Sequence, residues 1–407
     1  LGKHEPFLNS DLGKNVLVYP LLINDNPDIQ RGGCLVNGIE HEFSKQTRAR
    51  AMQPYTNVDI KEWRIKQRKT PIKLNGFWLY AGPIYKHFGH CMAESFHRLW
   101  PAIINRKLPL KGLLFLGKEG EKNEKSQYIL NYQREVIEYF NLNSMEIKIC
   151  TEPLIVEKLL IPTQASTLGP LSEPSDQYIN LLTENMSLVN SKYESDYFYI
   201  SRSKLQSTSR LIGEKLIETK LRKHGFKIIY PEDLNLIEQL EIYSSAKRLV
   251  FCEGSAIHAL EILGTIKADV DIVSRGGFRQ KRLKSMESIL SKRCANLFIH
   301  DQITRHPPLT FMKDALGQIV PCHWNIGIWF KFHEFKKLII FLTRENEVEL
   351  DFEEYKKHMS IEFLDYLLDF GSSNYDRLDE KSFNYAWIET KRLINSTLDS
   401  GINQEKK

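Results

Sequence analysis

The stretch RLVFCEGSAIHALEI, residues 248–262, has the pattern of a strand, a tight turn and a helix in direct succession. Four of its first five residues are apolar, which is typical of a strand buried on both faces of a parallel sheet. Glu253 and Gly254 supply the turn, and Ser255 is a favoured N-cap residue. Amides at a helix start attract anions, and Gly254 allows a phosphate to approach closely. The stretch therefore predicts a strand–turn–helix unit with an anion site at the start of the helix.

Other side chains near this stretch suit the rest of a nucleotide. Glu253 can accept hydrogen bonds from ribose hydroxyls, and His258 can donate one to a phosphate. Upstream, residues 196–204 read DYFYISRSK and repeat the strand-and-turn pattern. Arg202 and Lys204 then project beyond the carboxyl end of a strand, where they can bind a diphosphate. Each turn taken alone is better explained as surface or as ordinary capping than as a binding site.

Apolar, β-branched runs alternate with amphipathic stretches over much of the chain, which is typical of doubly wound parallel sheets. We expect helices at residues 214–224 and 237–246. We expect strands at residues 16–22, 77–81, 112–116, 154–161, 197–200, 227–229, 249–252 and 270–273. The chain has 407 residues, too many for one ordinary core. The sequence therefore predicts an α/β protein with more than one domain.

The polar stretch 164–175 contains two prolines and is the best candidate for a linker. We therefore expect an N-terminal lobe at residues 1–165 and a nucleotide-binding lobe at residues 166–320. Residues 321–407 have a mainly helical pattern, and we expect them to pack across both lobes.

A carboxylate among imidazoles follows the predicted strand 77–81. Residues 87–101 read HFGHCMAESFHRLWP, and a helix there places His90, Glu94 and His97 in one sector, with His87 beside them. Such a group suits general-base chemistry. Two alternatives remain open: a solvated polar face, and a metal site on His90, Glu94 and His97. No further cysteine or aspartate cluster completes a coordination sphere for the metal site.

The composition limits the compartment and the partners. The net charge of +5 suits a phosphate-bearing ligand and does not argue for nucleic acid. The 6 cysteines are scattered without a CxxC pair, which predicts a reducing compartment. No run of apolar residues approaches the length of a membrane span. We expect a cytoplasmic protein, with the basic stretches 61–69 and 279–284 and the aromatic stretch 324–337 as candidates for contact with a membrane surface.

Several motifs together resemble glycosyltransferase family 61, which includes bacterial capsule and lipopolysaccharide enzymes, plant xylosyltransferases and animal O-linked N-acetylglucosaminyltransferases. The resemblance covers roughly residues 75–275. It rests on His87-Phe88-Gly89-His90, Glu94, Arg98-Leu99, Tyr199-Ile200-Ser201-Arg202, Gly225-Phe226, Pro231-Glu232-Asp233-Leu234 and Glu238-Gln239, in this order. One departure concerns the turn, where the family usually has His-Gly and this chain has Glu253-Gly254.

The resemblance implies the GT-B arrangement, in which two Rossmann-like lobes face each other across a cleft. It implies inverting transfer of a sugar from a nucleotide-diphosphate donor, UDP above all, to a saccharide or lipid-linked saccharide acceptor of surface polysaccharide. Glu94 is then the general base, with His90 as the other candidate, and His87 and His97 lie on the acceptor side. Positive charge from the protein replaces a divalent ion, so that no metal cofactor is needed.

The donor side of this reading comprises Arg202, Lys204, Glu253, Gly254, Ser255 and His258. Two readings from other classes remain: a metal-dependent hydrolase centred on His90, Glu94 and His97, and a nucleotide-sugar-binding protein without catalysis.

Overall fold

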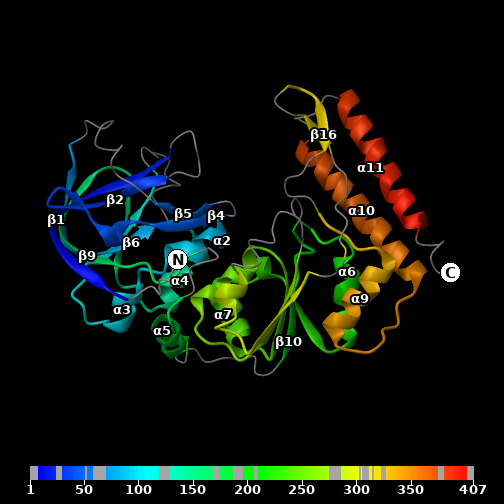
Figure 1. The fold of residues 1–407 in the computed structure, drawn as a ribbon, viewed down its shortest axis with the longest axis horizontal. Helices are drawn as coiled ribbons and strands as arrows, with labels where there is room; N and C mark the ends of the chain where they lie inside the picture. Colours follow the sequence, from blue (N-terminus) through cyan, green and yellow to red (C-terminus); the bar gives the residue numbers. More distant parts are fainter. Residues whose placement is uncertain are drawn as a thin grey trace.

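The computed structural model describes residues 8–23, 30–50, 53–57, 70–118, 129–167, 174–186, 196–205, 210–274, 286–301, 304, 311–313, 316–321, 327–374 and 380–400. Within them the protein is an α/β structure with two main sheets, the first at the left and the second at the centre of Figure 1. None of the described helices is both long enough and apolar enough to cross a bilayer. The basic stretches 61–69 and 279–284 lie outside the described residues.

The first sheet has the strand order β3-β2-β1-β9-β6-β7-β8 in the described part of the chain. Its strands are β1 (Ser10–Ile23), β2 (Gln30–Val36), β3 (Ile39–Glu40), β6 (Ile72–Pro83), β7 (Gly112–Leu116), β8 (Glu146–Cys150) and β9 (Leu154–Pro162). Strands β9, β6, β7 and β8 are parallel, whereas β1 and β2 are antiparallel to their neighbours. The first half of β1 is mostly polar, and Asp11, Lys14 and Asn15 are exposed there, whereas its apolar second half is buried at Val16 and Val18.

The second sheet is wholly parallel, with the described strand order β11-β10-β12-β13-β14. Its strands are β10 (Tyr197–Ile200), β11 (Phe226–Ile229), β12 (Arg248–Cys252), β13 (Asp269–Val273) and β14 (Asn296–His300). This is a doubly wound order whose direction of winding reverses between β10 and β12. Every residue of β12 is buried, as its apolar sequence predicts.

Helices connect the parallel strands of each sheet. Those of the first sheet are α2 (Phe88–His90), the π-helical turn η2 (Cys91–Ser95), α3 (Trp100–Ile104) and α4 (Asn131–Tyr139). Those of the second are α6 (Glu214–Lys223), η4 (Pro231–Asp233), α7 (Leu236–Ser245) and the 3₁₀ helix η5 (Ser255–Ile262). We call each sheet with its helices the first lobe and the second lobe.

Helix α5 (Asp176–Met186) follows the predicted linker and packs on both lobes. On the first lobe, the Asn185 side chain accepts a hydrogen bond from Arg106 and donates one to the carbonyl of Tyr139. On the second, the Thr183 hydroxyl accepts one from the backbone N–H of Thr265. One contiguous apolar core runs from β6 and β7 through α5 to β10 and β12. The two lobes therefore share their packing.

The C-terminal region, α9 (Phe332–Thr343), α10 (Phe352–Asn374) and α11 (Glu380–Ser400), lies at the right of Figure 1. Among the described residues its anchoring contacts lie on the second lobe, and packing across both lobes stays a prediction. Helix α9 packs on α6, and Phe335, Leu338 and Leu342 share a core cluster with that helix. The aromatic stretch predicted as a candidate membrane contact is buried at Trp329 and Phe330, because both side chains enter this cluster.

Glu362 of α10 ties this region to the start of α6. Its carboxylate accepts the backbone N–H groups of Gly213, Glu214 and Lys215 at 2.8–3.1 Å. Gly213 is the N-cap residue of α6 and has no side chain to serve these donors, so Glu362 supplies the cap. A cap of this kind contributes roughly 0.5–2 kcal/mol to stability.

The eight predicted strands all lie within observed strands, and the two predicted helices correspond to α6 and α7. The sequence patterns missed β2, β3, β8 and β14, and also two short hairpins. The first hairpin is β4 (Thr47–Arg50) with β5 (Gln53–Asn57), and the second is β15 (Phe311–Lys313) with β16 (Ile319–Pro321). These strands are short or lack an apolar run.

Candidate active site

Residues 87–101 do not form the single helix that we expected. Strand β6 ends at Pro83, α2 has only three residues, and the chain then widens into the π-helical turn η2 before leaving the helix at Phe96. Met92 and Phe96 are fully buried and anchor the turn in the core. Single π-helical turns are frequent at functional sites.

His90 and Glu94 form a hydrogen-bonded pair within this turn. The His90 Nδ1–H donates to Glu94 Oε1 over 2.6 Å. The Glu94 side chain is 0% exposed and that of His90 is 33% exposed, so the carboxylate lies behind the imidazole. The exposed His87 lies beside them, and its ring centroid is 5.2 Å from that of His90. Three of the four predicted residues, His87, His90 and Glu94, therefore lie close together.

His97 lies elsewhere. Its ring is wholly buried, and Nδ1 is 2.9 Å from the Tyr178 hydroxyl of α5. Burial lowers the pKa of His97 to about 4, so the ring is neutral at physiological pH. The helix has already ended at this point, and for this reason the sector expected for a continuous helix does not form. His97 contributes to packing between α5 and the first lobe.

The turn after β10 presents Arg202. Two buried glutamates of α6 hold it: Glu214 accepts the Tyr199 hydroxyl at 2.8 Å and the Arg202 backbone N–H at 2.9 Å. Glu218 accepts the Ser201 hydroxyl at 2.7 Å. Within the described residues the Arg202 guanidinium makes no hydrogen bond or ion pair. The tyrosine and serine of this motif therefore fix the turn, and the arginine remains available to a ligand.

The turn after β12 brings Gly254 against Arg202. A Cβ added to Gly254 would lie 2.0 Å from Arg202 Nη1, so only glycine leaves room for the guanidinium in this position. Gly254 itself is the cap residue of η5, and Ser255 is the first helical residue rather than the N-cap that we expected. Glu253 is only 3% exposed, and its backbone N–H donates to the Val273 carbonyl at 2.9 Å.

The turn that carries His90 and Glu94 meets the start of η5 at Gly89. A Cβ added to Gly89 would lie 2.9 Å from His258 Cδ2 and 3.4 Å from the Cβ and Oγ atoms of Ser255. Helices α2 and η5 are thus in direct contact, and we call this contact the junction. Because α2 follows the end of β6 and η5 follows the end of β12, the carboxyl ends of parallel strands from both sheets meet here. Ligands bind at such edges in open α/β sheets.

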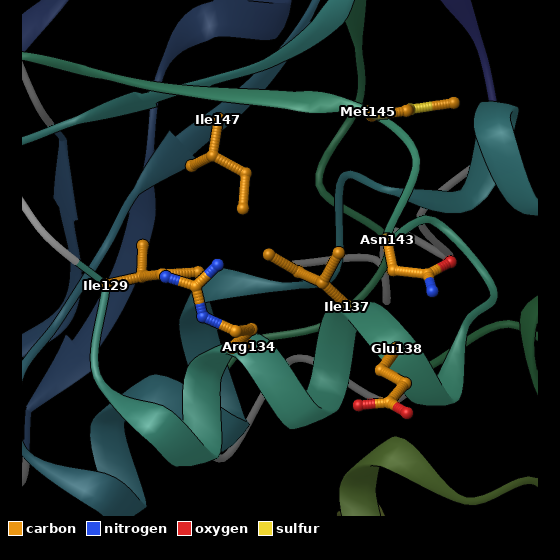
Figure 2. Close-up of a pocket in the computed structure, with 7 residues that line it drawn as sticks. All are labelled: Ile129, Arg134, Ile137, Glu138, Asn143, Met145 and Ile147. Atoms are coloured by element: carbon orange, nitrogen blue, oxygen red, sulfur yellow. The ribbon is translucent and has the colours of Figure 1, made fainter.

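Lys204 is not directed at the junction. Its ammonium pairs with Asp233 and lies 4.2 Å from the centroid of the Tyr230 ring. Ser203, Lys204 and Tyr230 line part of a cavity of about 820 Å³ between α6 and α10. A smaller cavity, of about 370 Å³, lies between α4 and β8 on the first lobe (Figure 2). Figure 2 shows Arg134 and Glu138 of α4 beside its apolar lining, and none of the predicted site residues contributes to it.

Sequence reasoning missed three carboxylates that hold the predicted residues in place. Glu214 and Glu218 support the Arg202 turn, and Glu261 pairs with His258, with Nδ1 and Oε1 separated by 2.6 Å. The spacing of three residues between His258 and Glu261 was a usable signal on a predicted helix. The supports of Arg202 had no such local signal, because they lie 12 to 17 residues away.

The described residues contain no group of three or more His, Cys, Asp or Glu side chains arranged to hold a metal ion. The set His90, Glu94 and His97 does not converge, since His97 turns into the core toward Tyr178. The hydrolase reading required that convergence, so it lacks geometric support.

Other motif residues are structural. The buried Arg98 guanidinium donates to the backbone carbonyls of Phe43, Lys45 and Pro162. Gln239 donates to the carbonyls of Pro231 and Leu234 and fixes the start of α7. These contacts give Arg98 and Gln239 a structural role away from the junction.

Comparison with known proteins gives one match, to a family model. No curated protein sequence matches the chain. The family model Glycosyltransferase 61 matches residues 88–262, a span that begins in α2 and ends with η5. It thus contains both sides of the junction. Residues 88–262 are therefore similar to glycosyltransferase family 61.

Proposed function

We propose that the protein transfers a sugar from a nucleoside-diphosphate donor to a saccharide hydroxyl, with inversion, at the junction between the lobes. The observation that carries this proposal is the contact of Gly89 with Ser255 and His258. It brings the His90–Glu94 pair beside the turns that present Arg202 and Gly254. Two sheets whose parallel strands meet at their carboxyl ends are consistent with a GT-B arrangement, which we include in the proposal.

His90 is the general base in this mechanism. We expected Glu94 first, but its carboxylate is fully buried and bonded to Nδ1, whereas the imidazole is one-third exposed. Nε2 of His90 accepts the proton of the acceptor hydroxyl as the oxygen attacks the anomeric carbon. Glu94 orients the ring and stabilises the imidazolium that forms. The bond from the anomeric carbon to the phosphate oxygen breaks, and its electron pair leaves with the nucleoside diphosphate.

Arg202 and the backbone amides at the start of η5 receive the departing diphosphate. A guanidinium can bind two phosphate oxygens at once, and the junction places it against Gly254. Fixed positive charge of this kind stabilises a leaving diphosphate without a divalent ion, and we propose that no metal is needed. Removing one such contact costs on the order of 10²–10³ in rate.

The choice of substrates rests on the family alone. We propose UDP as the nucleotide and a saccharide or lipid-linked saccharide of surface polysaccharide as the acceptor. The donor sugar is then the first quantity to determine, and release of nucleoside diphosphate from a panel of nucleotide sugars measures it without knowledge of the acceptor.

The test compares His90→Gln, Glu94→Gln and a control, His333→Gln, whose side chain is 52% exposed on α9. His90→Gln is expected to lower kcat about 10²–10⁴-fold, because a glutamine amide cannot accept the proton. Glu94→Gln is expected to lower kcat as well, while His333→Gln has no effect. Wild-type turnover in His90→Gln, with the fold intact by circular dichroism, would refute the assignment of the base.

A further inference from the structure

A second carboxylate–imidazole pair lies on the other side of the junction. His258 Nδ1 and Glu261 Oε1 are 2.6 Å apart, the same separation as in the His90–Glu94 pair. The Glu261 side chain is 2% exposed and that of His258 is 10% exposed, so the carboxylate again lies behind the ring. Each lobe thus contributes one imidazole to the junction, and each imidazole is held through Nδ1.

Buried Arg293 interacts with Glu261. The Arg293 guanidinium is wholly buried, donates to the Leu263 carbonyl and interacts electrostatically with Glu261. The glutamate therefore interacts with a buried cation and with an imidazole, and it is shielded from water. A carboxylate in this position cannot rotate toward solvent without leaving Arg293 uncompensated, which is costly for a buried charge.

The free edge of the His258 ring faces the junction. Its Cδ2 atom is the closest neighbour of the added Cβ on Gly89, and Nε2 is bonded to Cδ2 in the ring. Within the described residues Nε2 has no hydrogen-bond partner. Because Nδ1 is held by Glu261, Nε2 is the atom that remains for a ligand beside Ser255 and the Arg202–Gly254 contact.

We infer that Glu261 is a positioning residue for the leaving group: it holds His258 as the imidazolium, in which Nδ1–H donates to Glu261 and Nε2–H donates to the terminal phosphate of the departing nucleoside diphosphate. This inference rests on the proposed function. As the bond to the anomeric carbon breaks, its electron pair passes to that phosphate, and the Nε2–H bond strengthens with the charge. The proton of the acceptor goes to His90, so the two imidazoles have opposite roles.

The experiment compares binding of UDP and UMP to the full chain by isothermal titration calorimetry. Only UDP has the terminal phosphate that His258 contacts. Glu261→Gln is expected to weaken UDP binding roughly ten- to hundredfold, the loss of one charge-assisted hydrogen bond, and to leave UMP binding unchanged. Glu261→Asp is expected to restore part of the difference. The exposed Glu287→Gln serves as the matched control and keeps the wild-type preference.

A double substitution separates positioning from folding. In a His258→Phe background, Glu261→Gln is expected to cause no further loss of UDP affinity, because its effect passes through the imidazole. An unchanged ratio of UDP to UMP affinity in Glu261→Gln, or additive losses in the double variant, would overturn the inference while leaving the proposed function intact. If the wild-type protein bound no uridine, guanosine, adenosine or thymidine diphosphate, the proposed function would fail and this inference with it.

Discussion

Replacing Gly89 with alanine adds one methyl group at the junction. Gly89 is not among the glycines with a positive φ, so the backbone accepts alanine without strain. The new Cβ would lie 2.9 Å from His258 Cδ2, whereas carbon atoms are most favourably 3.5–4.0 Å apart. The ring must therefore move by roughly 0.6 Å or more, or the lobes must separate by that amount.

Both responses have a measurable cost. An additional methyl group in a well-packed contact destabilises by about 1–3 kcal/mol. A displacement of this size at a reacting centre lowers kcat up to about 10²-fold. We expect Gly89→Ala to lower the free energy of unfolding in urea and to reduce kcat, with the larger effect on kcat. The unfolding free energy and the release of nucleoside diphosphate are measured on the same preparation.

The second variant of a double-mutant cycle identifies the contact responsible. In a His258→Ala background the ring is absent, so Gly89→Ala is expected to cost little further stability. Additive losses in the double variant, or a Gly89→Ala protein as stable and active as the wild type, would show that α2 and η5 do not pack as described. The junction would then not be the active site.

Two further outcomes follow from the packing of the second lobe. Gly254→Ala is expected to weaken binding of a nucleoside diphosphate about as much as Arg202→Ala does, because the new Cβ displaces the guanidinium. Calorimetry measures both affinities. Unequal losses of affinity would contradict the contact between Gly254 and Arg202. Burial raises the pKa of both Glu214 and Glu362 from 4.5 to about 7, so the folded state retains protons that the unfolded state has released between these values. Their contribution to the free energy of unfolding therefore falls as pH rises from about 4.5 to 7. The free energy of unfolding of the wild type and of Glu362→Gln is measured by urea titration at several pH values. The variant is expected to lose the part of the pH dependence that Glu362 contributes. Parallel pH profiles of the two proteins would contradict the burial of this carboxylate.

Local sequence determined the alternation of strands and helices and the two turns that carry Arg202 and Gly254. Residues 197–200 and 249–252 are apolar throughout their length or nearly so, and such runs form buried strands through contacts within a few residues. The ends of these strands then follow from the turn residues. The order of motifs along roughly residues 75–275 indicated the resemblance to the family for the same reason, since each motif is contiguous, and the family model matches residues 88–262 of this span.

Tertiary structure decided which polar side chains act together. His90, Glu94 and His97 were equivalent on a helical wheel, yet the π-helical turn buries Glu94 behind His90 and directs His97 to Tyr178, 81 residues away. The junction joins Gly89 to residues more than 160 positions later in the chain. The exposure of a side chain depends on what packs over it, and the elements that pack here are distant in sequence. Periodicity reports only which face a residue shares with its near neighbours, so the pairing of two imidazoles across two lobes was visible only in the folded chain.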